Sequence, residues 1–189
     1  MIRIFSVLAT ANALGLLLSF GFGLWSMLRG SLENKDDLVF NIHFLSGLFS
    51  GVVTLLVHCM IFTYFLGTGR WVKEVTLAYD LPDDPLHKTT RELKRKAFPP
   101  ALFAMLTVMA AAFAGGGRML QGWPYQIHLL LAIAAIVVNF WAYWVEVRCL
   151  RANDAILAGV YREVDRVRAE RGLPSNEESR RMEEEQQQV

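Results

Sequence analysis

Four long runs without acidic or basic residues decide what this chain can fold into. They contain three histidines but no Asp, Glu, Lys or Arg, and cover residues 4–28, 38–69, 97–117 and 119–145. A helix needs about 20 apolar residues to cross roughly 30 Å of hydrocarbon, and every run is long enough. Strands are excluded because no run alternates polar with apolar residues, as membrane-barrel strands do. We therefore predict an all-α, polytopic membrane protein whose residues 1–150 form a four-helix up-down bundle, with spans at about 4–28, 38–67, 98–117 and 123–147.

The composition of the 189 residues agrees with a lipid environment. Hydrophobic residues make up 53% and charged residues 20%, against roughly 25% charged in an average soluble domain. The first apolar run is too long for the apolar part of a signal peptide and is followed by no small-residue cleavage site, so we expect it to be retained as a span. The net charge of +1 gives no sign of a nucleic-acid partner.

The distribution of Lys and Arg predicts how the spans are oriented. Seven of these residues lie in the connection at 70–97, whereas Arg118 is the only one between the third and fourth spans. Because Lys and Arg are enriched on the cytoplasmic side, we expect the 70–97 connection and both termini to be cytoplasmic. A bacterial inner membrane is the expected location, with the lipid bilayer as the first partner.

The 70–97 connection carries a turn signal followed by a charged stretch. The turn signal is Pro82 to Pro85, and the charged stretch from Lys88 to Lys96 has helix-forming composition. We expect a short surface helix there. Pro99 and Pro100 should then open the third span, because the first turn of a helix tolerates proline.

Beyond the fourth span the apolar pattern narrows to one helical seam. Steps of three and four residues predict that the fourth helix extends into the cytoplasm over 151–173, until Gly172 and Pro174 end it. This seam could pair with another copy of the chain, or pack on the 70–97 connection of the same chain. The polar residues 174–189 are expected to form a frayed helix or to be disordered. The seam consists of Leu150, Asn153, Leu157, Val160, Val164 and Val167.

Two histidines are predicted to lie at the same depth in the bundle. Spans two and four run in the same direction, and His43 and His128 each follow the outer start of their span by a few residues. A haem held between histidines of two helices needs this matched depth, and small residues where its plane passes. Gly47 and Ala132 lie one turn further along, and Arg118 is the nearest fixed cation for haem propionates. Either histidine taken alone is better explained as an interfacial residue that hydrogen-bonds a neighbouring carbonyl or hydroxyl, and it is the matched depth that favours a haem.

With this placement the bundle resembles the four-helix haem-binding core of b-type cytochromes. In that family the second and fourth helices supply the axial histidines, and each carries two of them about a dozen residues apart. Here span two has His43 and His58, about 22 Å apart along the helix, but Ala142 and Tyr143 occupy the place of a second ligand in span four. The resemblance therefore implies one haem b, ligated by His43 and His128 near the outer face.

His58 belongs to a second polar group nearer the cytoplasmic side. Asn12 and Asn139 are expected at its level. His58 is then either a core histidine with satisfied hydrogen bonds, or part of a proton or quinone site with Tyr64 and Glu146.

Three function classes follow from these patterns, and the absence of soluble-enzyme motifs leads us to expect no enzymatic activity of the chain on its own. The first is a haem-binding electron-transfer module. The second is a non-enzymatic accessory or scaffold subunit, part of a larger membrane complex or a homo-oligomer. The third, a homo-oligomeric channel, is less favoured because the polar faces of the spans lack the charged rings of selectivity filters.

Overall fold

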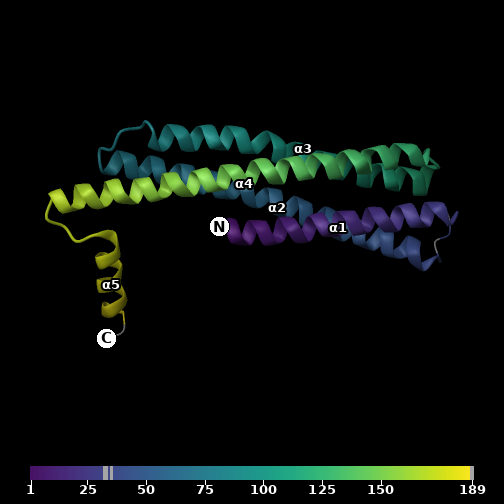
Figure 1. Ribbon diagram of the computed structural model, residues 1–189, viewed down its shortest axis with the longest axis horizontal. Helices are drawn as coiled ribbons and strands as arrows, with labels where there is room; N and C mark the ends of the chain where they lie inside the picture. The colour runs from purple at the N-terminus through teal and green to yellow at the C-terminus, as the bar shows by residue number, and fades with distance from the viewer. Residues whose placement is uncertain (32–33, 35, 188–189) are drawn as a thin grey trace. The chain divides into compact units, whose positions relative to one another are not determined.

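The computed structural model describes residues 1–31, 34 and 36–187, and this part of the chain is helical with no strand. Four of its helices are long and apolar enough to cross a membrane. The prediction of an all-α fold with four spanning helices is therefore confirmed. The helices are α1 (Ile2–Leu28), α2 (Leu38–Ala78), α3 (Leu86–Gln121), α4 (Tyr125–Glu170) and α5 (Asn176–Gln186) (Figure 1).

Three of the helices extend well beyond the apolar runs. α2, α3 and α4 contain 41, 36 and 46 residues, so the connection expected at 70–97 is reduced to a short turn between Ala78 and Leu86. The stretch from Lys88 to Lys96 is the beginning of α3 itself, not a separate surface helix, because its Lys, Arg and Glu residues favour a helix that continues into the span.

The prediction that Pro99 and Pro100 open the third span is wrong, since both lie inside α3. A proline inside a helix removes one N–H donor from the backbone ladder. The charged turns before the two prolines form hydrogen bonds and ion pairs of their own, such as Lys88 Nζ to Asp84 Oδ2 at 2.7 Å, and the helix begins there.

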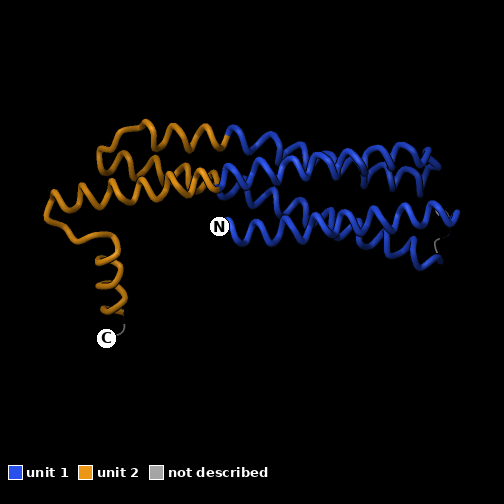
Figure 2. Tube along the Cα trace, in the orientation of Figure 1, with its two compact units in different colours: residues 1–64, 95–150 blue, residues 65–94, 151–189 orange. Residues whose placement is uncertain are grey.

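The chain divides into two compact units (Figure 2). Unit 1 comprises residues 1–64 and 95–150, and contains α1 together with the apolar parts of α2, α3 and α4. Its interior is rich in small residues, such as Ala101, Ala104 and Ala142, which are fully buried. Its surface carries large apolar side chains instead, such as Phe49 and Phe113, which are both 71% exposed. Small residues inside and large apolar residues outside are typical of helices that pack closely within lipid.

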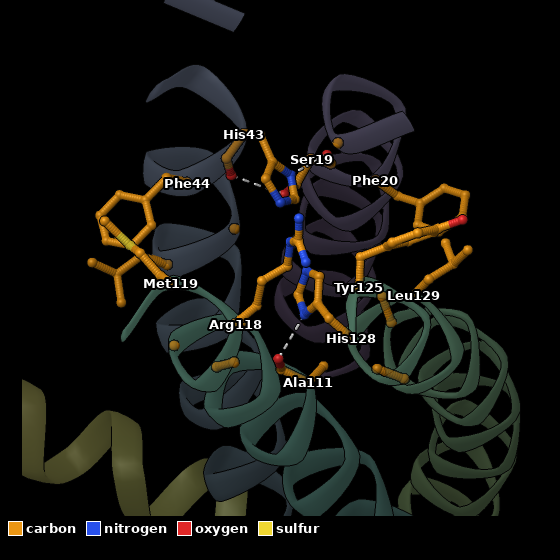
Figure 3. Close-up of a pocket in the computed structure, with 18 of the residues that line it drawn as sticks. Ser19, Phe20, His43, Phe44, Ala111, Arg118, Met119, Tyr125, His128 and Leu129 are labelled. Carbon is orange, nitrogen blue, oxygen red and sulfur yellow. Dashed lines mark hydrogen bonds between the residues drawn. The ribbon is translucent and has the colours of Figure 1, made fainter. Parts of the chain in front are cut away.

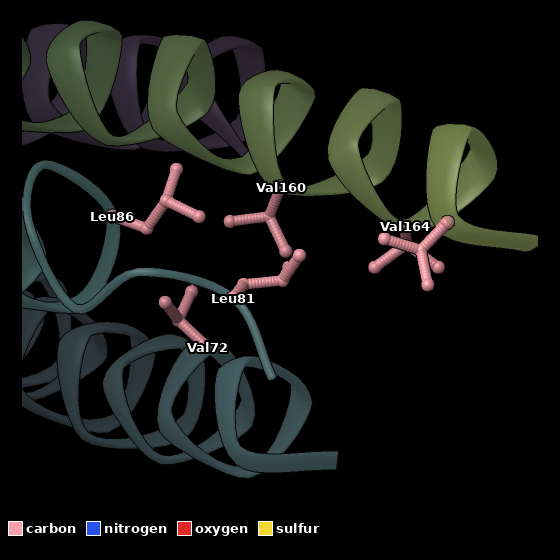
Figure 4. Packing of buried hydrophobic residues seen from close by; sticks show 6 residues of the cluster. Val72, Leu81, Leu86, Val160 and Val164 are labelled. Carbon is pink, nitrogen blue, oxygen red and sulfur yellow. The ribbon is translucent and has the colours of Figure 1, made fainter. Parts of the chain in front are cut away.

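Unit 2 comprises residues 65–94 and 151–189 and has its own apolar core. Val160, Val164 and Val167 of α4 pack against three residues that lie between positions 72 and 86 of the same chain (Figure 4). Of the two partners considered for the seam, the structure thus contains the intramolecular one. The core consists of Val72, Leu81, Leu86, Val160, Val164 and Val167.

The polar tail forms a capped helix over most of its described length. Ser175 begins α5 with a capping box, in which its side chain accepts from the Glu178 N–H and the Glu178 carboxylate accepts from the Ser175 N–H. Asp165 Oδ1 also accepts from the Asn176 backbone N–H at 2.8 Å. These bonds satisfy N–H groups that are otherwise unpaired in the first turn of a helix. The last two residues of the tail lie outside the described residues.

Candidate cofactor site

Unit 1 contains a cavity of about 560 Å³, within the range of roughly 300–1,000 Å³ typical of small-molecule sites. Residues of all four long helices line it. It reaches from the end of the unit where α1 ends and α4 begins to about half-way down the helices, at Leu16 and Ala135. Its lining is mostly apolar, and its polar side chains are Ser19, His43, Arg118, Tyr125 and His128.

His43 and His128 meet in this cavity. Their ring centroids are 5.9 Å apart and their planes are inclined by 70°. Figure 3 shows both imidazoles extending into the cavity, one from α2 and the other from α4. The parallel direction of these two helices brings the histidines together, although 85 residues separate them in the chain.

A backbone carbonyl orients each of the two rings. The Nδ1 atom of His43 lies 2.9 Å from the carbonyl oxygen of Ser19, and Nδ1 of His128 lies 2.8 Å from that of Ala111. A carbonyl oxygen can only accept, so Nδ1 is the donor in both bonds. In the neutral rings the lone pair is therefore on Nε2. The carbonyl bond expected of an ordinary interfacial histidine is present, but among the described residues it engages only the Nδ1 atom of each ring.

Each imidazole lies against a glycine of a neighbouring helix. A Cβ atom on Gly23 would be 2.8 Å from Cε1 of His43, and one on Gly115 would be 3.1 Å from Cε1 of His128. The predicted Gly47 also lines the cavity, but a Cβ there would meet Ser19 Oγ at 3.0 Å, so Gly47 makes room for α1. Neither Gly23 nor Gly115 is among the residues predicted for the site from the sequence, although three successive glycines, Gly115 to Gly117, are a signal for Gly115.

Arg118 and Ala132, the other predicted members of the site, both line the cavity. Arg118 Nη1 donates to the carbonyl oxygen of Trp123 at 3.2 Å, and its guanidinium lies 5.8 Å from the ring centroid of Tyr125. These contacts hold the cation near the end of the unit, where α3 turns into α4 (Figure 3).

A second polar cluster is buried on the other side of unit 1. His58, Asn139 and Glu146 are all fully buried. His58 Nδ1 lies 2.7 Å from Glu146 Oε1, and Nε2 lies 3.0 Å from Asn139 Oδ1. Both ring nitrogens of His58 are therefore engaged in hydrogen bonds within the cluster.

Asn12 and Tyr143 join this cluster. Asn12 Nδ2 donates to Thr54 Oγ1 at 2.7 Å and to the Tyr143 hydroxyl at 2.6 Å. The Tyr143 ring stacks on His58 with a centroid distance of 5.2 Å. The structure thus brings the predicted His58, Asn12 and Asn139 to one place. The tyrosine that joins this cluster is Tyr143. The predicted Tyr64 is half-buried on α2. The sequence signal for Tyr143 was its helical spacing, since Asn139, Tyr143 and Glu146 share one face of α4.

The remaining histidine, His87, lies in unit 2 and pairs with Asp83 at 2.8 Å. Among the described residues, no group of three or more His, Cys, Asp or Glu side chains could hold a metal ion. Comparison of the chain with models of known protein families, with curated proteins and with solved structures finds no match.

Proposed function

We propose that unit 1 is a haem-binding electron-transfer module of a membrane, with His43 and His128 as the axial ligands of one haem b. The observation that carries this proposal is the pair of imidazoles, 5.9 Å apart in the cavity, with both Nδ1 atoms hydrogen-bonded to carbonyls. Two metal–nitrogen bonds of about 2 Å each would place the two ring centroids roughly 6 Å apart. The observed separation agrees with such a site.

The carbonyls of Ser19 and Ala111 prepare the two rings for ligation. A hydrogen bond from Nδ1 fixes the tautomer and the ring orientation, and it makes Nε2 a better donor to a metal ion. Gly23 and Gly115 fix the ring positions, because no side chain stands between each ring and the helix behind it.

The remainder of the cavity suits a large, planar, apolar group with anionic substituents. A haem bound there would supply a one-electron couple whose potential depends on its axial ligands and its burial. The apolar lining keeps water away, and the guanidinium of Arg118 can pair with propionate groups. Arg118 is also the only basic residue between the third and fourth apolar runs. This distribution of Lys and Arg supports a cavity toward the non-cytoplasmic face, with both termini in the cytoplasm of a bacterial cell.

The absorption spectrum of the protein, purified from haem-replete cells, tests this proposal. We expect a Soret band that is lost in His43→Ala and His128→Ala. His87→Ala is the matched control, because it removes a histidine of unit 2, and it should retain the band. A colourless wild-type protein, or a band that both alanine variants retain, would overturn the proposal and favour the non-enzymatic accessory subunit, which needs no bound group.

A further inference from the structure

A column of buried polar residues runs between α1 and α2, from the cavity to the His58–Glu146 pair. It begins at Ser19, which lines the cavity. Ser50 follows, with its Oγ against Gly15, where a Cβ atom would be only 2.7 Å away. Thr54 Oγ1 donates to the carbonyl oxygen of Ser50 at 2.8 Å, and Asn12 donates to Thr54. None of these side chains is more than 5% exposed.

The His58–Glu146 pair holds one proton between its two facing atoms. Asn139 Nδ2 donates to the carbonyl oxygen of Ala135 at 2.8 Å, which makes Oδ1 the acceptor for the Nε2–H of His58. The short contact between His58 Nδ1 and Glu146 Oε1 then needs a single proton. Whether that proton resides on the nitrogen or on the oxygen, the pair carries no net charge.

The same cluster can accept a further proton. Glu146 Oε2 and Asn12 Oδ1 are buried, and neither has a hydrogen-bond partner among the described residues. A buried acceptor without a partner costs free energy. An ionisable pair in a membrane interior with such an acceptor is a candidate for proton binding.

We propose that the His58–Glu146 pair is a proton-binding site whose proton content is coupled to the charge of the group held between His43 and His128. This inference rests on the proposed haem function. A one-electron donor that reduced a haem held there would bring one negative charge into the bundle. The pair takes up one proton from the aqueous phase, so that Glu146 becomes a neutral carboxyl beside a protonated His58. One electron and one proton then enter together, and the low-dielectric interior gains no net charge.

Few other titratable groups face the pair. From α4 these are Tyr143 and Cys149, both of which interact electrostatically with Glu146, and from α3 Lys96 interacts with Cys149. α1 faces the pair with the uncharged Asn12, and with Phe5, whose ring packs edge-on against Tyr143. The pair itself is therefore the place where a proton can be added with the least rearrangement.

The midpoint potential of the purified protein, measured as a function of pH, tests the coupling. We expect the midpoint potential of the wild type to fall as the pH rises. Reduction is coupled to the uptake of a proton, and the proton concentration is lower at higher pH. Glu146→Gln should make the potential independent of pH, since its amide N–H donates to His58 Nδ1 and holds the pair in the one-proton state. Glu74→Gln, which changes an exposed carboxylate paired with Arg70, should retain the slope.

An infrared difference spectrum between the oxidised and reduced forms gives a second readout. A carboxyl band should appear on reduction of the wild type, shift on ¹³C labelling of glutamate, and vanish in Glu146→Gln. This band tests the coupling in the wild type, even where Glu146→Gln loses its haem. A protein without a Soret band refutes the proposed function and this coupling with it. A haem-containing protein that has a flat potential and no such band, or an unchanged slope in Glu146→Gln, refutes the coupling alone.

Discussion

The glycines behind the two imidazoles give the site its sharpest test at the residue scale. Gly23→Ala would bring a Cβ atom to 2.8 Å from the His43 ring, and Gly115→Ala would bring one to 3.1 Å from the His128 ring. Each ring would have to move, so we expect both variants to lose at least half of their haem, and Gly23→Ala to lose more. The haem-to-protein ratio from the absorption spectrum measures this.

Gly21 of α1 is the matched control, because it does not line the cavity and a Cβ atom there would meet nothing within 4 Å. Gly21→Ala should keep the haem, and stabilise its helix by roughly 0.5–1 kcal/mol, because alanine loses less conformational freedom than glycine. Equal haem loss in all three variants would show that the ring contacts do not determine binding.

The members of the site differ in how far the sequence predicts them. Equal depth follows from the rise of a helix and the direction of the spans, so His43 and His128 are found by counting residues. The carbonyls of Ser19 and Ala111 cannot be found in this way, because any residue type supplies a carbonyl and only the packing of α1 and α3 decides which one faces the ring. Tyr143 was missed for a related reason, since an aromatic residue near the end of a span also fits an interfacial position.

At the scale of the element, the sequence predicts where a helix crosses lipid better than where it ends. Hydropathy falls after residue 67, but α2 continues to Ala78, because charged residues change the environment of a helix without breaking its backbone hydrogen bonds. Pro99 and Pro100 lie inside α3, so residues expected to begin a helix can also lie in its interior. A strong breaker signal is overridden where a long apolar stretch on one side and paired charges on the other both favour the helix.

The capping box of α5 makes the stability of this helix depend on pH. Hydrogen bonds from the backbone N–H and the hydroxyl of Ser175 lower the pKa of the Glu178 carboxyl. A carboxyl with a lowered pKa stabilises the folded form above its ordinary pKa, about 4.3, and this contribution is lost as the pH falls through the lowered value. We therefore expect the protection of the α5 amide protons, which is the slowing of their exchange compared with that of an unfolded chain at the same pH, to fall as the pH drops below about 4.3. Ser175→Ala should lower this protection at neutral pH and weaken its pH dependence, because the hydroxyl bond is lost while the backbone N–H still donates to Glu178. Equal protection in both proteins at every pH would contradict the cap.

At the scale of the whole molecule, four helices that are long and apolar enough to cross a membrane predict that the two ends of the chain lie on one side and that the connections alternate between the two faces. Hydropathy alone predicts this alternation, which is why the four-span fold could be predicted from the sequence. Which face is which depends on a different property, the excess of Lys and Arg in the 70–97 segment over the single Arg118 in the last turn of α3. Direction and number of spans therefore need separate tests.

Cysteine labelling in intact cells checks the direction. The chain contains two cysteines, Cys59 and Cys149, and replacing them with Ser and Ala gives a background without thiols. In this background Gln121→Cys and Glu92→Cys introduce exposed thiols without removing a basic residue. A membrane-impermeant maleimide should label Gln121→Cys in intact cells, and Glu92→Cys only after the membrane is opened. The reverse pattern would place the cavity and its histidines toward the cytoplasm, and an electron donor of the haem would then have to be sought on that side.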